Sequence, residues 1–212
     1  MNLPVFVLGA GGHSKVAIEA LLASSVRVHG ILDPDRQKKG MIILGVSVIG
    51  AEDELLKYKK ESILLVNGLG SIRKTKQRNT LYLRFKKDGY RFARVIHPAA
   101  VIASDVKVEE GAHVMAGAVI QPGSVIGENA IVNTNASVDH DCQIGSHVFL
   151  APGVTLSGGV HVGEGTHIGT GAIIIQGLQI GRNALIGAGT LVVKDVPDGV
   201  TIIGLPGRVA QT

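Results

Sequence analysis

The second half of this 212-residue chain repeats with a period of six. Counting in sixes from Ile102 to Val192 meets Ile, Leu or Val at all sixteen positions, and a small residue often follows four places later. A period of six fits neither an α-helix nor a simple β-hairpin. It is typical of a parallel β-helix, in which each unit forms one short flat side and one corner. The repeat therefore predicts a three-sided prism with an aliphatic interior.

Three units make one coil of such a prism. Sixteen units thus predict about five coils, stacked to about 25 Å at the usual strand spacing. Residues 18 apart then lie over one another, and glycines and other small residues allow the close corners. Cys142 occupies one of the small-residue positions, so we expect it to pack in the interior and not to act as a nucleophile.

The first half of the chain alternates strand-like and helix-like segments. Strands are predicted over Pro4–Leu8, Val28–Leu32, 46–49 and 62–68, and helices over 14–24, 51–60 and 71–88. Such alternation is typical of an α/β unit with a largely parallel sheet. The predicted fold is therefore α/β followed by all-β, with a small Rossmann-like domain over residues 1–97 and a β-helix over residues 98–212.

Composition excludes several classes of protein. One cysteine rules out an intramolecular disulfide and a cysteine-rich zinc site. No run approaches 18 apolar residues and the N-terminus lacks a signal-peptide pattern, so we expect a cytoplasmic protein without membrane insertion.

Residues 1–97 carry 17 Lys and Arg against 8 Asp and Glu, whereas residues 98–212 carry 4 against 9. The basic half could be a solvated surface or could steer an anionic ligand, and nucleic acid is disfavoured because aromatic residues are only 3%.

A glycine-rich loop follows the first predicted strand. Gly9, Gly11 and Ser14 form G-x-G-x-x-S, in which serine replaces the last glycine of the dinucleotide fingerprint. The glycines still let backbone N–H groups approach a phosphate at a helix N-terminus. Asp33 follows the second strand, where an acid could bind a ribose or a base. The loop indicates a nucleotide-phosphate site, and a purely structural glycine turn is the other interpretation.

His140 lies two residues after Val138, at an outward corner, between Asp139 and Asp141. A carboxylate beside a histidine fixes its tautomer and favours the imidazolium formed on proton uptake. The residue could therefore be a general base, or a polar corner with a surface ion pair. Gly158 follows 18 residues later, so its backbone N–H is predicted to lie beside His140, where it could stabilise a developing oxyanion.

The same spacing argues against a metal site within one chain, because no histidine of the repeat has a His or Cys 18 residues later. Thr170 and Ala188 are also 18 apart, in a different corner column from His140. Columns from different corners can meet only when a second subunit presents its edge. A site between chains follows if the prism trimerises.

Four motifs together resemble one known family. They are GAGGHSKV at residues 9–16, Asp33, IHP at 96–98 and NTNASVDHDC at 133–142, on a hexapeptide prism. The chain is similar over nearly its whole length to the bacterial nucleotide-amino-sugar N-acetyltransferases, grouped with the sialic acid O-acetyltransferases. The ending at residues 202–209 is similar to the exit loop that closes such prisms. The resemblance implies a left-handed β-helix, a homotrimer with sites between subunits, acetyl-CoA as co-substrate and a UDP- or GDP-linked 4-amino sugar as acceptor.

The resemblance also implies roles for individual residues. His140 would be the general base, Asp141 would orient it, although some members have Glu there, and Gly158 would donate to the oxyanion. Contacts with the nucleotide sugar are implied for Gly11, Gly12, His13, Asp33, Gly68 and Asn133. Positions along the CoA groove are implied for His147, Thr170 and Ala188.

The implied reaction is direct transfer, in which the sugar amine loses a proton to His140 and attacks the thioester carbonyl. No covalent acyl-enzyme is expected, because Cys142 points inward. O-acetylation of a sugar or sialic acid is a second interpretation, since the same base could deprotonate a hydroxyl. A trimeric scaffold carrying a ligand-sensing unit is a third.

Overall fold

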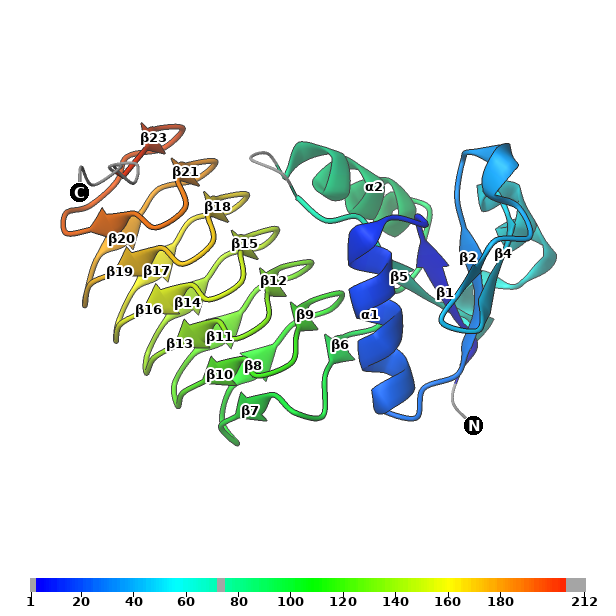
Figure 1. The fold of residues 1–212 in the computed structure, drawn as a ribbon, viewed down its shortest axis with the longest axis horizontal. Helices are drawn as coiled ribbons and strands as arrows, with labels where there is room; N and C mark the ends of the chain where they lie inside the picture. Colours follow the sequence, from blue (N-terminus) through cyan, green and yellow to red (C-terminus); the bar gives the residue numbers. More distant parts are fainter. Residues whose placement is uncertain (1–2, 72–74, 205–212) are drawn as a thin grey trace, which may run out of the picture.

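The computed structural model describes residues 3–71 and 75–204, and it contains an α/β unit joined to a β-helix (Figure 1). The α/β unit is built on a five-stranded sheet in the order β3-β4-β2-β1-β5, parallel except for the β3–β4 hairpin. Its elements are β1 (Val5–Leu8), α1 (Gly12–Ala23), β2 (Val28–Leu32), η1 (Arg36–Lys38), β3 (Ile42–Ile43), β4 (Val46–Gly50), η2 (Glu52–Lys57), η3 (Lys60–Ser62), β5 (Leu64–Asn67) and α2 (Lys76–Lys87).

Strand β1 shows why the apolar run at 5–8 predicts a central strand. All four of its residues are buried, because side chains alternate between two cores. Val5 and Val7 pack in the core that α1 covers, whereas Phe6 and Leu8 pack in a second core with residues of α2. The predicted strands and the helix at 14–24 are confirmed in this unit.

Two local predictions differ from the structure. The helix predicted over 51–60 is replaced by the two 3₁₀ segments η2 and η3, in which Leu55 alone is buried. A helix with so little buried surface gains little from packing, and short helices depend on packing for their stability. The β3–β4 hairpin was not predicted, and it turns through Leu44 and Gly45, which have φ of 49° and 80°. Helix α2 begins at Lys76, and residues 72–74 of its predicted span lie outside the described residues.

The β-helix consists of two-residue strands stacked in three parallel sheets, which we name faces A, B and C. Face A contains β6 (Val95–Ile96), β9 (His113–Val114), β12 (Ile131–Val132), β15 (Phe149–Leu150), β18 (His167–Ile168), β21 (Leu185–Ile186) and β23 (Thr201–Ile202). Face B contains β7 (Val101–Ile102), β10 (Val119–Ile120), β13 (Ser137–Val138), β16 (Thr155–Leu156), β19 (Ile173–Ile174) and β22 (Leu191–Val192). Face C contains β8 (Lys107–Val108), β11 (Val125–Ile126), β14 (Gln143–Ile144), β17 (His161–Val162) and β20 (Gln179–Ile180).

The predicted register is confirmed, since strand partners are 18 residues apart, as in the pairing of Ser137 with Thr155. The aliphatic residue of each unit points inward, and Cys142 is fully buried among these residues. Every sixth residue from Gly111 to Gly189 has a positive φ. These corner positions hold only Gly, Asn, Asp or His, and Gly, Asn and Asp adopt this conformation at least cost.

The two units share an apolar core. Val95 and Met115 of the prism are fully buried in the same cluster as the inner residues of α1. Strand β6 already pairs with β9, so the prism begins at Val95, three residues before the start expected at residue 98. Figure 1 shows α1 lying beside the first coils, while the later coils extend away from the α/β unit. Within the described ranges, no helix has the length and apolarity needed to cross a membrane.

Candidate active site

His140 and Asp141 lie at the corner between face B and face C. Asp141 has a φ of 59°, and this left-handed turn brings its carboxylate back toward the preceding ring. Its Oδ2 lies 2.9 Å from Nδ1 of His140, whose side chain is about half exposed. Since Nδ1 is held as the donor in this hydrogen bond, Nε2 of the neutral ring carries the lone pair. The His140 ring can therefore accept a proton from an incoming group at Nε2.

The charge around His140 supports this protonation. The hydrogen bond with Asp141 raises the pKa of His140; desolvation opposes the shift, and the charges of Asp139 and Asp141 add to it. Asp139 also accepts a hydrogen bond of 2.8 Å from the backbone N–H of His140. The site therefore stabilises the imidazolium that a general base becomes.

Gly158 lies against the His140 ring, as the 18-residue spacing predicts. A methyl group at Gly158 would overlap the imidazole, lying 2.5 Å from its Cε1. The next residue, Gly159, donates its N–H to the backbone carbonyl of His140 at 2.8 Å, whereas no partner for the N–H of Gly158 is found among the described residues. A free backbone donor beside a base is the arrangement that an oxyanion requires.

A second region is a cavity of about 1000 Å³ between the α/β unit and the prism. Gly12 and His13 bring the N-terminus of α1 to it, and Lys76 brings the start of α2. Asn133 and Thr134 line it from the corner between faces A and B, so the structure brings Gly12, His13 and Asn133 together. The partial positive charge of a helix N-terminus and the Lys76 ammonium favour an anion in this cavity.

The glycine-rich loop beside this cavity is tied together by Ser14. Its buried hydroxyl donates to the carbonyl of Gly9 at 2.6 Å and lies 3.0 Å from that of Gly68. A side chain at Gly68 would lie 2.5 Å from that hydroxyl, so Gly68 permits a close backbone approach beneath the loop. By contrast, no other part of the described residues comes within 4 Å of a Cβ built at Gly11 or Gly12. The open side of the loop is therefore at Gly11 and Gly12.

Asp33 is buried within the turns that follow β1 and β2. Its carboxylate accepts hydrogen bonds from the N–H of Ala10 at 2.7 Å, the N–H of Asp35 at 3.0 Å and Lys38 Nζ at 3.0 Å. Burial alone would raise the pKa of Asp33, but these hydrogen bonds, with that of Lys38 the strongest, lower it overall. Asp33 thus shapes the loop from below, and it does not line the cavity.

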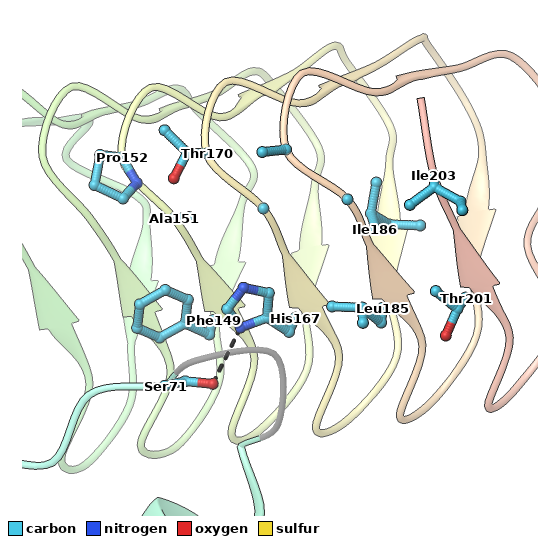
Figure 2. A pocket seen from close by; sticks show the side chains of 13 residues that line it. Ser71, Phe149, Ala151, Pro152, His167, Thr170, Leu185, Ile186, Thr201 and Ile203 are labelled. Carbon is cyan, nitrogen blue, oxygen red and sulfur yellow. Dashed lines mark hydrogen bonds between the residues drawn. The ribbon is translucent and has the colours of Figure 1, made fainter. Parts of the chain in front are cut away.

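A third region is a groove of about 700 Å³ along face A and its corner with face B, shown in Figure 2. Phe149, His167, Leu185 and Thr201 form one stacked column on its floor. The Phe149 and His167 rings are parallel, with centroids 4.9 Å apart, and Ser71 Oγ reaches from the α/β unit to within 3.0 Å of His167 Nδ1. Burial lowers the pKa of His167 to about 4, so this ring is neutral at pH 7.

Two of the three residues for which the family resemblance implies a CoA groove lie in the wall of this groove. Thr170 and Ala188 line it, whereas His147 is buried at the contact between the two units. His147 Nδ1 lies 3.0 Å from Asn129 Nδ2, and its ring meets Tyr82 edge-on.

Sequence reasoning missed Phe149, which is the one phenylalanine after residue 92. A bulky aromatic at an outward position of an aromatic-poor repeat is the signal that could have identified it.

The cavity and the groove are adjacent, because Ser71, Phe149 and Pro152 line both. His140 lies outside both the cavity and the groove. It follows β13 of face B, whereas Asn133 and Thr134 precede that strand, so His140 and the two ligand-sized spaces lie at opposite edges of one face. Within one chain they do not form a single site.

Comparisons with known proteins find matches to both halves of the chain. The PglD N-terminal domain family matches residues 4–82, and the bacterial transferase hexapeptide family matches residues 123–158. A stretch of 73 residues is 32% identical to the uncharacterized protein L142 of Acanthamoeba polyphaga mimivirus, and it spans 34% of this chain but only 14% of that protein.

Solved structures match over the whole fold. The acetyltransferase domain of PglB from Neisseria gonorrhoeae, in complex with acetyl coenzyme A, is 35% identical with a TM-score of 0.87, covering 96% of this chain and 97% of that one. PerB from Caulobacter crescentus, in complex with CoA and GDP-perosamine, is 39% identical with a TM-score of 0.86, over 98% and 97% of the two chains. WeeI from Acinetobacter baumannii is 27% identical with a TM-score of 0.83, over 99% and 100%. The chain therefore belongs to the family of left-handed β-helix, hexapeptide-repeat acyltransferases that includes the bacterial nucleotide-amino-sugar N-acetyltransferases.

Proposed function

We propose that this protein transfers an acetyl group from acetyl-CoA to the 4-amino group of a UDP- or GDP-linked amino sugar, with His140 as the general base. The observation that carries the proposal is the adjacency of the two ligand-sized spaces. Because the cavity and the groove share Ser71, Phe149 and Pro152, a sugar in one and a thioester in the other would meet at these residues.

The cavity suits the nucleotide sugar. Gly12 and His13 at the α1 N-terminus and the Lys76 ammonium would bind the diphosphate, while Asn133 and Thr134 would face the sugar. Gly11 would leave room for the ligand on the open side of the loop. In this proposal Asp33 and Gly68 act by holding the loop in place, since their polar and packing contacts are made within the protein.

The groove suits the pantetheine arm of acetyl-CoA. Four stacked residues from Phe149 to Thr201 span roughly 14 Å along the prism axis, at about 4.8 Å per coil. The surface of the groove is mainly apolar, with hydroxyl groups at Thr170 and Thr201. Such a lining fits a chain of methylene groups interrupted by amides.

In the proposed step the sugar nitrogen attacks the thioester carbonyl carbon and its proton passes to Nε2 of His140. The Gly158 N–H donates to the oxyanion of the tetrahedral intermediate. The C–S bond then breaks, the carbonyl reforms as an amide, and the proton leaves His140 for the CoA sulfur. Asp141 keeps Nδ1 of the ring as a donor throughout.

The proposal requires a second copy of the chain, and we propose a homotrimer. The outward column of face B is apolar at both ends, where Val101, Ile173 and Leu191 are 63%, 44% and 59% exposed, and it carries Ser137 and Thr155 in its middle. Packing this face between copies would bury the column. It would also bring the His140 edge of one prism to the groove edge of its neighbour.

The test is thiol release from acetyl-CoA with a panel of UDP- and GDP-linked amino sugars. We expect release with at least one of them. We expect His140→Ala to lower kcat by roughly 10²- to 10⁴-fold, and His161→Ala, an exposed histidine on face C, to leave turnover unchanged. Wild-type turnover in His140→Ala would contradict the base assignment. No release with any of these amino sugars would favour O-acetylation or a binding scaffold.

A further inference from the structure

Arg78 on α2 is buried at the contact between the two units and has no carboxylate partner in the described chain. Its guanidinium donates to three backbone carbonyls, those of Asn67 at 2.6 Å, Leu69 at 2.7 Å and Asn129 at 3.3 Å. Burial lowers the pKa of Arg78 to about 9, so it remains a cation at pH 7. Its Nη2 is fully buried and finds no acceptor among the described residues.

A pair of histidines lies beside this cation. His13 Nε2 is 3.1 Å from His113 Nδ1, and the planes of the two rings are nearly parallel, at an angle of 14°. Burial, and then the charge of Arg78, lower the pKa of His13 to about 3 and that of His113 well below its usual value. Both rings are therefore neutral, and one of them must donate the hydrogen that they share.

Arg78 and the histidine pair pack against the same short segment. The carbonyl of Leu69 accepts from Arg78, and a Cβ built on the next residue, Gly70, would lie 3.2 Å from the Cβ of His13. On the prism side, Arg78 binds the carbonyl of Asn129, two residues before the strand that pairs with His113. The cation and both rings thus belong to one buried cluster.

The two possible tautomers of the histidine pair differ in whether His113 places a donor or a lone pair in the cluster that contains the Arg78 cation. If His13 donates, His113 carries its hydrogen on Nε2, which is fully buried and has no partner among the described residues. Two buried donors, Nε2–H and Nη2–H, would then lie in one positively charged cluster without acceptors, and each such donor is costly. If His113 donates instead, its Nε2 carries a lone pair that the cation stabilises.

We infer that Arg78 is a positioning residue that holds His113, and through it His13, in the Nδ1–H tautomer, so that His13 offers a hydrogen-bond donor to the diphosphate of the nucleotide sugar. The inference rests on the proposed function for the identity of the ligand. His13 lines the cavity and its Nε2 is engaged with His113, which leaves Nδ1 as its other polar atom. With the opposite tautomer, His13 would present a lone pair that repels an anion.

The test is a two-bond ¹H–¹⁵N correlation spectrum of the histidine rings in the full-length protein at pH 7, which distinguishes a protonated from an unprotonated ring nitrogen. Signals are assigned with His13→Gln and His113→Gln. We expect both residues as Nδ1–H tautomers in the unmodified protein. A His13 ring with its hydrogen on Nε2 would overturn the inference, and this measurement on the unmodified protein needs no substrate.

The role of Arg78 is tested by substitution. We expect Arg78→Met to return His13 to the Nε2–H tautomer and to weaken UDP or GDP binding about tenfold, with acetyl-CoA binding unchanged. Arg78→Lys, which keeps the charge, should retain the Nδ1–H tautomer. Arg84→Met, an exposed arginine of the same helix, is the matched control and should change neither readout. An unchanged His13 tautomer in Arg78→Met would overturn the inference. If the unmodified protein binds neither UDP nor GDP, the proposed function is contradicted instead, and the His13 tautomer can still be measured.

Discussion

At the scale of single residues, the candidate catalytic corner combines two short-range effects. Left-handed backbone at Asp141 lets two adjacent residues form a side-chain hydrogen bond, and the absence of a side chain at Gly158 makes room for the His140 ring. Each effect acts on the same imidazole. The orientation of His140 and its affinity for a proton therefore depend on both neighbours.

The pH dependence of turnover tests the Asp141 contact. A base must be neutral to accept a proton, so kcat/KM should fall as the pH drops through the raised pKa of His140. Asp141→Asn keeps the shape and removes the charge, and we expect it to move this acidic limb to lower pH. Asp139→Asn, whose contact is with the backbone N–H, is the matched control and should move it less. A limb that stays in place in Asp141→Asn would contradict the role of Asp141.

The space at Gly158 leads to a second prediction. Gly158→Ala places a methyl group where the His140 ring lies, so the ring must move away from the donor. We expect kcat to fall about 10²- to 10³-fold, the loss typical of a disrupted oxyanion site, with an unchanged circular dichroism spectrum. Ser157→Ala, at the preceding residue, should retain near-normal turnover. Normal turnover in Gly158→Ala would show that the ring and this donor do not act together.

At the scale of the elements, the corners determine how the coils close. A residue with positive φ recurs at every sixth position, and Asn183 is one of those that are not glycine. An L-residue with a Cβ and no polar side chain is strained there by about 1–2 kcal/mol. The repeat thus places a conformational requirement on each unit in addition to its aliphatic residue.

The Asn183 corner provides a stability test. We expect Asn183→Ala to lower the melting temperature by about 2–4 °C, because alanine retains the strain and loses the polar side chain. Asn183→Gly removes the strain and should melt closer to the unmodified protein. Differential scanning calorimetry of the two variants checks the order, and equal melting temperatures would show that the corner conformation carries no cost.

At the scale of the whole molecule, the separation of His140 from the groove is the dominant feature. The two lie at opposite edges of face B, and the outward column of that face, apolar at its two ends, lies between them. A second copy packed on this face would unite a base from one chain with a groove from another. The proposed active site is therefore a property of the assembly.

Subunit mixing tests this arrangement. His140→Ala lacks the base, and Ala188→Trp fills the groove at an exposed position, so each alone should be inactive. Co-expressed in equal amounts, the two variants should recover about a quarter of the unmodified turnover, since random assembly restores that share of sites made from two chains. If each site lay within one chain, the mixture would stay inactive. Sedimentation of the mixture serves as the control for assembly.

The β-helix followed from the sequence alone because each of its units obeys the same local rules. A stack of this kind has contacts mainly between neighbouring coils, so the period places every inward residue and every residue 18 positions later. This is why the positions of Cys142 and of Gly158 beside His140 were predictable. The alternating apolar runs of the α/β unit were predictable for the same reason, whereas η2, η3 and the β3–β4 hairpin depend on packing and turn geometry that the runs do not encode.

Only the tertiary structure decided how the α/β unit meets the prism. That contact buries Arg78, His113 and His147, opens the cavity beside His13 and Asn133, and brings Ser71 to the groove. It depends on the fit of two aperiodic surfaces, for which neither spacing nor composition carries a signal. The sequence thus determined the chemistry available at each corner, and the packing of the two units determined which of those corners border a ligand-sized space.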